Sequence, residues 1–295
     1  MSHPLDLDQP PKWVVPLMRF GYTARGVTYV ILGVLTFLAA WTGGEAEGTS
    51  SALASLREQP WGVPLLWVVA AGLLGYAIWR FVAAWWDLEL HGTGAKGIVA
   101  RIGLCVTGAI HAGLAVSAAR QAIGSGGGSG SGESDSVNTL ASWVMQQEPW
   151  GKWVLIAIGA ITVGAGIYYA FKGINEKYKR HMRQSPRSQA LDPAIKFGLI
   201  AHGVVIAIIG LFLIGAGWTA DPSQAGGVGQ AFEAVRAQPF GRILLGALAI
   251  GLVGFAIYCF AEARYRIVPR CANPDTKTLA GRFDHAFDKA IARVT

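Results

Sequence analysis

The chain of 295 residues is 52% hydrophobic and 15% charged, and its mean hydropathy is +0.39. This composition excludes an ordinary pair of soluble domains, which the length alone would allow, and it indicates a membrane protein. A formal net charge of +7 is compatible with nucleic-acid binding. We nevertheless expect no nucleic acid as a partner, because a basic rim beside anionic lipid headgroups accounts for the same charge.

Six tracts of mostly apolar residues are long enough to cross a bilayer as helices. A hydrocarbon layer of about 30 Å needs about 20 helical residues, at about 1.5 Å each. The first tract starts too late and is too long for a cleaved signal peptide, so we expect a retained helix after an amino-terminal tail of residues 1–18. In chain order the predicted spans are Phe20–Trp41, Trp61–Trp86, Ile98–Ile123, Trp150–Ile174, Ile195–Trp218 and Phe240–Ala261.

The spans fall into three similar pairs. A proline is tolerated in the first turn of a helix and an aromatic residue favours the headgroup level, so a Pro-aromatic-Gly phrase predicts the start of a helix at the interface. The second span of each pair is preceded by such a phrase: Gln59-Pro60-Trp61-Gly62, Glu148-Pro149-Trp150-Gly151 and Gln238-Pro239-Phe240-Gly241. The first span of each pair opens on a shared pattern: Arg19-Phe20-Gly21 with Gly26, Arg101-Ile102-Gly103 with Gly108, and Lys196-Phe197-Gly198 with Gly203.

This repetition predicts an all-α membrane protein with six transmembrane helices, arranged as three tandem two-helix repeats about a pseudo-threefold axis. The repeats comprise residues 19–90, 98–177 and 194–266. Each repeat has an even number of spans, so all three keep one orientation in the membrane. Apolar residues at helical spacing predict a short interfacial helix before each Pro-aromatic-Gly phrase, at Ser51–Glu58, Val137–Gln147 and Gly229–Ala237. The recurrent glycines of the spans predict close helix packing.

Two segments outside the spans have distinctive compositions. Gly124–Ser136 has no apolar residue and predicts a flexible external loop without a site. Residues 267–295 are basic, and apolar residues at four-residue intervals predict a cytoplasmic amphipathic helix that rests on the membrane or on a partner. These residues are Leu279, Phe283, Phe287 and Ile291.

Two motifs carry a resemblance to a known family. Gly21-Tyr22-Thr23-Ala24-Arg25-Gly26 and Gln238-Pro239-Phe240-Gly241-Arg242, within three two-helix units, resemble a bacterial membrane family known as domain of unknown function 1206. The resemblance covers about Arg19–Arg266 and implies six helices in three repeats, with no established activity, ligand or catalytic residue. The second unit departs most: Glu148 replaces the glutamine of the phrase, and Thr107 stands where the first unit has Arg25.

Polar side chains within the spans form the candidate intramembrane cluster, because each is costly in lipid. Its members are Arg25, Arg80, His111, His202 and Glu262. Two interpretations of the arginines stay open. They extend to the headgroups, or they project inward and either pair with a carboxylate or bind an anion such as a lipid phosphate. The candidate carboxylates are Asp87, Glu89 and Glu262.

The histidines leave several alternatives. His111 lies near the middle of the third span and cannot reach either interface, so it is a neutral imidazole bonded to a neighbouring helix, a proton relay or a ligand contact. Haem ligation together with His202 is the least favoured, because the two differ by about four residues in depth. Glu262 and Lys172 lie at the ends of spans, and their default interpretation is interfacial charge.

No sequence motif indicates catalysis or a cofactor. Nucleophile elbows, zinc-protease motifs, phosphate-binding loops and dinucleotide fingerprints are absent from the sequence. The three cysteines, Cys105, Cys259 and Cys271, are far apart and predict neither a disulfide framework nor a metal site. We therefore expect no enzyme, no cofactor and no metal.

Two functional classes remain. The first is a structural or accessory subunit of a larger membrane complex, or a lipid-binding scaffold. The second is a pathway for a small solute, an anion or protons along the pseudo-threefold axis. A pathway needs polar residues that converge on a cavity, whereas a subunit needs packing and a complementary face. Membrane lipids, with anionic headgroups at the cytoplasmic face, are the expected partners in either class, and a larger membrane complex is expected in the first.

The positive charges indicate the orientation. Of the 25 lysines and arginines, five lie on one side of the spans and the rest lie on the other. By the positive-inside rule, the richer side faces the cytoplasm. We therefore expect a multi-pass protein of the bacterial inner membrane with both termini in the cytoplasm. The five are Arg57, Arg120, Lys152, Arg236 and Arg242.

This orientation predicts how cysteines react in intact cells. In a background without native cysteines, one placed in Gly124–Ser136 should react with an impermeant maleimide added outside, and one placed in Lys177–Arg187 should react only after the membrane is opened. The asymmetry of loop charge is the reason. Reversed labelling of the two positions would contradict the predicted orientation.

Overall fold

The computed structural model describes residues 13–43, 48–124, 133–147 and 149–271, and its regular elements in these ranges are helices. Six of them are long and apolar enough to cross a membrane, which confirms the predicted all-α class with six spans. They are α1 (Val14–Thr42), α3 (Gly62–Trp85), α4 (Ala95–Ile123), α6 (Gly151–Ile174), α8 (Asp192–Thr219) and α10 (Gly241–Tyr265).

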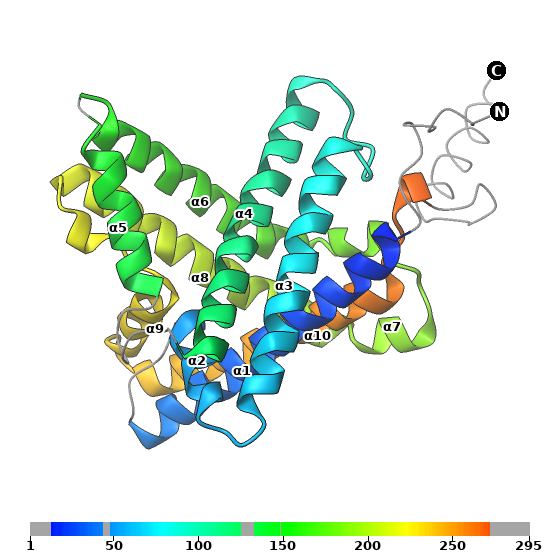
Figure 1. Cartoon of the computed structure of the whole chain (residues 1–295), viewed down its shortest axis with the longest axis horizontal. Helices are drawn as coiled ribbons and strands as arrows, with labels where there is room; N and C mark the ends of the chain where they lie inside the picture. Colours follow the sequence, from blue (N-terminus) through cyan, green and yellow to red (C-terminus); the bar gives the residue numbers. More distant parts are fainter. Residues whose placement is uncertain (1–12, 44–47, 125–132, 148, 272–295) are drawn as a thin grey trace.

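Short helices connect the long ones (Figure 1). One precedes the second long helix of each unit: α2 (Thr49–Arg57), α5 (Glu133–Met145) and α9 (Val228–Arg236). These helices pack against the bundle, since Leu53 of α2 and Phe232 of α9 are fully buried. The remaining elements are α7 (Pro186–Ala190) and three 3₁₀ turns, η1 (Lys177–His181), η2 (Pro222–Gln224) and η3 (Pro269–Cys271).

Two predicted boundaries are wrong. Residues 14–18 belong to α1 and not to the tail, because proline is tolerated in the first helical turn and Val14 and Met18 are fully buried. The predicted loop Gly124–Ser136 ends early, because α5 begins at Glu133; serine and acidic residues favour a first turn, where no apolar residue is needed. The predicted helix with Leu279 to Ile291 lies outside the described residues.

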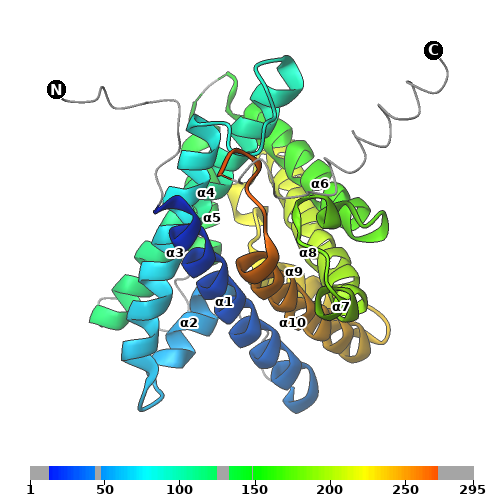
Figure 2. The ribbon, with the colours of Figure 1, turned by 90° about the vertical axis from the view of Figure 1, so that its right-hand side faces the viewer.

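The long helices form a ring of three close pairs. The second helix of each unit packs on the first helix of the next, as α3 on α4 and α6 on α8, and α10 of the third unit packs on α1 of the first. Figure 2 shows α1 and α10 side by side, between the α3/α4 pair and the α6/α8 pair. This repeating order gives the ring its pseudo-threefold character.

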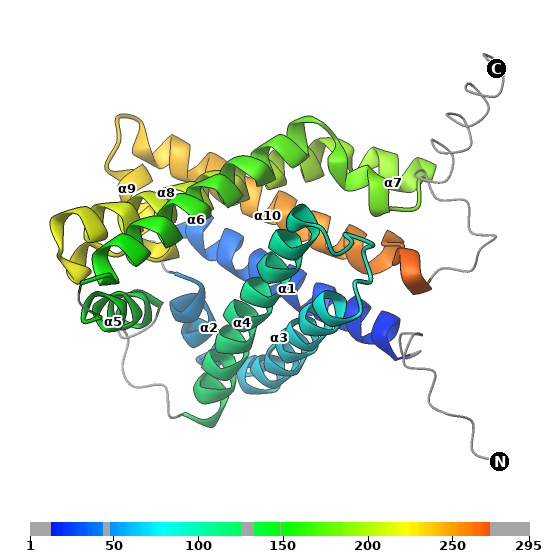
Figure 3. The same ribbon diagram turned by 90° about the horizontal axis from the view of Figure 1, so that it is seen from above.

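The two helices of the second unit break this regularity. Within the first and third units, α1 packs on α3 and α8 packs on α10, but α4 and α6 hardly touch each other. They run in clearly different directions in Figure 1, and Figure 3 shows the α3/α4 and α6/α8 pairs as separate bodies. We call the region between α4 and α6 the open seam.

The repeat alignment gives a steric reason for the open seam. A side chain at Gly72 would collide with Ala24, and a side chain at Gly251 would collide with Ala201, so both contacts need glycine. Counting from the hinge glycines and from the first-span openings, the corresponding residues of the second unit are Ile161 and Val106. These bulky side chains prevent α4 and α6 from approaching each other as closely as the paired helices of the first and third units do. Ile161 is 73% exposed and Val106 is 53% exposed.

Glycines at seven-residue intervals line the interface between α6 and α8. This interval is the repeat of a left-handed helix pair. A Cβ atom on Gly166 would lie 2.5 Å from the Gly203 carbonyl oxygen and 2.7 Å from the Ala207 nitrogen. The two helices therefore approach to backbone contact, as the glycine pattern predicts. The six glycines are Gly159, Gly166 and Gly173 on α6, and Gly203, Gly210 and Gly217 on α8.

Two neighbouring glycines of α6 give a matched test of this interface. Gly166→Ala should lower the thermal unfolding midpoint in detergent, because overpacking a close contact costs about 1–3 kcal/mol. A Cβ atom on Gly164 would meet nothing within 4 Å, so Gly164→Ala should leave the midpoint unchanged or raise it slightly. The higher helix propensity of alanine adds at most about 1 kcal/mol to the free energy of unfolding. Equal effects of the two substitutions would show that backbone contact at Gly166 is not what holds α6 to α8.

Candidate functional site

All five residues of the predicted polar cluster are buried in the bundle. They come from five different long helices, α1, α3, α4, α8 and α10, and their relative exposures do not exceed 9%. Arg25 is only 3% exposed, so the structure places it inside the ring and not at a headgroup level reached from the lipid side. The five are Arg25, Arg80, His111, His202 and Glu262.

The Tyr76 hydroxyl joins the two intramembrane arginines. Arg25 donates to it from Nη1 over 3.0 Å, and Arg80 donates from Nε over 2.8 Å and from Nη2 over 2.5 Å. Arg80 also donates to the Tyr22 hydroxyl at 3.2 Å. Gly21 makes this meeting possible, because a Cβ atom there would lie 2.6 Å from the Tyr76 backbone. The close approach of α1 and α3 thus brings Arg25 to Tyr76.

An ion cluster closes the end of the ring where α3 and α10 finish. Arg80 Nη1 lies 3.8 Å from Glu89 Oε1, and Arg266 donates to the same oxygen over 2.5 Å. Arg266 also forms an ion pair with Glu262. Of the three carboxylates proposed for the arginines, Glu89 is therefore the partner of Arg80, and Glu262 is the partner of Arg266. Asp87 instead accepts the backbone N–H groups of the turn that follows α3.

The histidines occupy aromatic surroundings. His111 Nδ1 lies 2.8 Å from the Thr107 carbonyl oxygen, so this nitrogen bonds to its own helix and not to a neighbouring helix, which was one of the alternatives for this residue. A histidine within a helix can reach the carbonyl oxygen four residues earlier, so this hydrogen bond needs no neighbouring helix. His202 stacks on Phe255, with the ring centroids 3.8 Å apart, and its Nδ1 is buried without a hydrogen-bond partner.

Tyrosines on α1 and α6 surround these groups. Tyr29 and Tyr169 both meet the His202 ring edge to face, with the centroids 5.2 and 5.0 Å away. Lys172, on the same helix as Tyr169, donates to the Tyr258 hydroxyl over 2.7 Å. Lys172 thus joins α6 to α10 through a side-chain hydrogen bond and is not a plain interfacial charge.

The network carries more positive than negative side chains. Four cations, Arg25, Arg80, Lys172 and Arg266, face two carboxylates, Glu89 and Glu262. In the part of the chain that the structure describes, no carboxylate lies within ion-pair distance of Arg25. Its guanidinium instead lies over the rings of Phe255, Tyr76 and Tyr29, at 4.9, 5.2 and 5.6 Å from their centroids, and its Nε has no partner.

Sequence reasoning missed the tyrosines and Arg266. Tyr22, Tyr76 and Tyr258 resemble ordinary apolar residues of the spans, and Arg266 is predicted only as the last residue of the third repeat. One signal was available. Tyr76 precedes Arg80, and Glu262 precedes Arg266, by four residues, which places each pair on one face of a helix. Nothing in the sequence of α6 indicates that Tyr169 meets His202 on α8.

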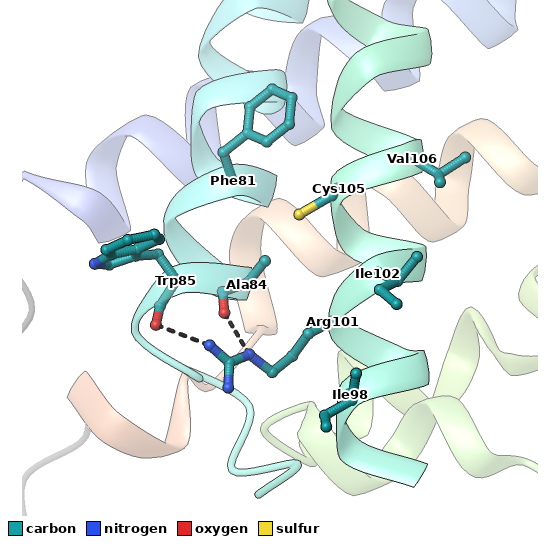
Figure 4. A pocket seen from close by; sticks show the side chains of 8 residues that line it. All are labelled: Phe81, Ala84, Trp85, Ile98, Arg101, Ile102, Cys105 and Val106. Atoms are coloured by element: carbon teal, nitrogen blue, oxygen red, sulfur yellow. Dashed lines mark hydrogen bonds between the residues drawn. The ribbon is translucent and has the colours of Figure 1, made fainter. Parts of the chain in front are cut away.

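An apolar groove lies apart from the network, between α3 and α4 (Figure 4). Arg101 is the polar residue of its lining, and it donates to the carbonyl oxygens of Ala84 at 2.6 Å and Trp85 at 3.2 Å. It therefore caps the end of α3 and is not turned toward a ligand. Among the described residues no three His, Cys, Asp or Glu side chains are grouped as metal ligands. The other lining residues are Phe81, Ile98, Ile102, Cys105 and Val106.

Comparisons with known proteins agree with the three-unit reading. The family described as "Domain of Unknown Function (DUF1206)" matches residues 20–87, 102–176 and 197–266, one segment for each two-helix unit. The chain is 32% identical over 258 residues to "Uncharacterized protein YxxB" of Bacillus subtilis, across 86% of this chain and 92% of that protein. No solved structure matches the chain. The resemblance drawn from the two motifs is thereby confirmed.

The ion cluster predicts a dependence of stability on pH. Burial raises the pKa of Glu89, but the charges of Arg266 and Arg80 outweigh burial and lower the pKa from 4.5 to about 2. A depressed pKa stabilises the fold above the unfolded value and loses this contribution as the pH falls from about 4.5 toward 2. Glu89→Gln should lower the free energy of unfolding at pH 7 by about 3 kcal/mol, the cost of a broken buried pair, and so lower the unfolding midpoint. It should also flatten the decline in stability between pH 5 and 3.

The exposed Glu58 supplies the control. Thermal unfolding at several pH values should give Glu58→Gln the wild-type profile. If Glu89→Gln kept the wild-type midpoint at neutral pH, the ion cluster would not hold the ends of α3 and α10 together.

Proposed function

We propose that this chain, which belongs to the DUF1206 family of membrane proteins, binds an anionic group at the network around Arg25. The family brings no activity, so the proposal depends on the chain's own geometry. One observation carries it: Arg25 is a guanidinium 3% exposed inside a six-helix bundle, it donates to the neutral Tyr76 hydroxyl, and no carboxylate lies within ion-pair distance of it in the described part of the chain.

The free energies favour an anion over a purely structural role. Arginine at the centre of a membrane helix costs about 2.5–3.5 kcal/mol on insertion scales. A desolvated cation over an aromatic ring gains about 2 kcal/mol, and one hydrogen bond to a charged group contributes about 1.5–3 kcal/mol. The three rings and Tyr76 therefore offset the burial of Arg25, but they leave its charge unneutralised and its Nε without a partner. An anion supplies both.

The chemistry of the site indicates an oxyanion. A guanidinium binds phosphate or carboxylate oxygens through a planar fork of N–H donors. Lys172 lies near the same region and is bonded to a neutral tyrosine hydroxyl, so its charge is also not cancelled in a direct ion pair among the described residues. We therefore propose a phosphate or carboxylate group as ligand, contributed by a lipid headgroup or by a free anion.

A binding site is favoured over a pathway along the axis. The cluster of Glu89, Arg266 and Glu262 occupies one end of the ring. Toward the other end, Leu32, Phe232 and Leu245 form a continuous apolar cluster. Among the described residues, the buried charged side chains and histidines therefore occupy one layer of the bundle and do not continue into this apolar cluster.

A structural or accessory subunit is the second candidate function. The observation that favours it is the large exposed apolar surface of α6, which includes Trp153 at 58% and Ile161 at 73% exposure. Lipid chains account for such a surface equally well, and a subunit role does not require the uncompensated charge of Arg25. The anion site is therefore the better supported proposal.

The test compares two arginines of α1. In nanodiscs of zwitterionic phosphatidylcholine, inorganic phosphate or added phosphatidylglycerol should raise the unfolding midpoint of the wild type, followed by tryptophan fluorescence. Arg25→Gln should weaken the anion affinity about 10- to 100-fold, since a charge-assisted hydrogen bond contributes about 1.5–3 kcal/mol. Arg19 is exposed, six residues earlier on the helix, and Arg19→Gln should respond as the wild type does.

The two anions separate the two sources of ligand. A response to phosphate indicates a free anion, and a response to phosphatidylglycerol alone indicates a lipid headgroup. If Arg25→Gln responded to both anions as the wild type does, no anion would bind at Arg25 and the subunit role would gain.

A further inference from the structure

We infer that the open seam between α4 and α6 is a lateral entrance through which an anionic membrane lipid places its headgroup at the Arg25 network, with its acyl chains along the two helices. This inference rests on the proposed function and names the source of the anion.

Two glycines mark the positions on α4 and α6 that border the seam. Gly103 and Gly164 have empty space where a Cβ atom would lie. Their repeat equivalents face the partner helix of the same unit: Gly21 lies against Tyr76, and Gly254 lies against Gly198. By the repeat alignment, Gly103 and Gly164 therefore occupy the positions of α4 and α6 that form the close helix contact in the other two units.

The second step is that the network reaches the seam. His111 belongs to α4 and contacts Tyr76, with the ring centroids 4.6 Å apart. Tyr169 and Lys172 belong to α6, and both are partly exposed. The helices on both sides of the seam thus carry side chains of the network.

The third step is that other routes to Arg25 are occupied by side chains. The ion cluster of Arg80, Glu89 and Arg266 lies toward one end of the bundle. The opposite end is filled by the apolar cluster of Leu32 and Phe232, and by a second one with Leu53 and Leu66. α1 packs closely on both α3 and α10. Around the ring, α4 and α6 are the neighbouring long helices that do not pack closely on each other, so the seam is the side of the bundle that helix packing leaves open.

The fourth step is that charge and polarity match an anionic lipid. Three buried groups of the network, Arg25 Nε, His202 Nδ1 and Arg266 Nε, have no hydrogen-bond partner, and the cations exceed the carboxylates. The walls of the seam are apolar, with Val106 and Ile161 exposed. A headgroup with one negative charge neutralises part of the excess, and acyl chains cover walls that a free phosphate ion would leave uncovered. A lipid satisfies both features.

The experiment maps where a lipid lies on the intact protein. The full chain is reconstituted in nanodiscs of phosphatidylcholine that contain phosphatidylglycerol with a photoreactive group in its acyl chain, and cross-linked peptides are identified by mass spectrometry. Cross-links should concentrate on peptides with Val106 and Ile161. Photoreactive phosphatidylcholine should label all lipid-facing helices evenly.

Three variants make the test specific. Arg25→Gln should reduce seam labelling by phosphatidylglycerol at least about tenfold, the loss of one charge-assisted bond. Gly164→Trp should reduce it several-fold by filling the seam, because the added ring enters empty space. Ile250→Trp is the control for Gly164→Trp, since Ile250 is 55% exposed on α10, and it should leave seam labelling unchanged.

The outcomes distinguish the entrance from the site. If Arg25→Gln abolished the response to phosphate but phosphatidylglycerol labelled all helices evenly, the lateral entrance would be wrong and the anion site would stand. If seam labelling persisted in Gly164→Trp at the wild-type level, the entrance would likewise be wrong. If Arg25→Gln changed neither the phosphate response nor the labelling, both proposals would fall.

Discussion

The hydrogen bonds from Arg25 and Arg80 to one hydroxyl group, that of Tyr76, organise the interior of this protein. Two guanidinium groups inside a membrane bundle repel each other and need acceptors that lipid does not supply. A neutral hydroxyl between them supplies an acceptor without adding a charge. The close contact of α1 and α3 at Gly21 follows from the same need, because Arg25 reaches Tyr76 only when the two backbones touch.

The departure of the second unit from threefold regularity has a definite steric basis. The first and third units close through a glycine against an alanine, and the second unit has isoleucine and valine there. A change of a few methyl groups at one crossing is enough to hold two transmembrane helices apart, since these helices associate through packing and not through a hydrophobic drive. The same unit has Ala165 where the others have Tyr76 and Phe255, so it also lacks the aromatic ring that fills the centre of its neighbours.

The ends of the bundle are held by different forces. At the end where α10 finishes, ion pairs join Glu89, Arg266 and Glu262, and the backbone N–H of Arg183 donates to the Tyr265 carbonyl oxygen. At the other end, α2 and α9 insert apolar side chains beneath the long helices. A polar layer enclosed between an ionic end and an apolar end suits a binding site reached from the side, and it does not suit a continuous aqueous path.

The spans, the three repeats and the five members of the candidate polar cluster were determined by the sequence alone. Length and hydropathy suffice for this, because lipid requires about 20 apolar residues per crossing wherever the chain crosses, and a repeat is visible as recurring residues. The partners of those polar residues were decided by the tertiary structure. Arg25 meets Tyr76 and Phe255 from helices far away in sequence, and Arg266, at the end of the third repeat, pairs with Glu89 of the first. The open seam also needed the structure, since Ile161 and Val106 acquire meaning only when the equivalent glycine and alanine are seen in contact. Hydropathy records that a residue is apolar, whereas packing depends on which atoms of two helices occupy the same space.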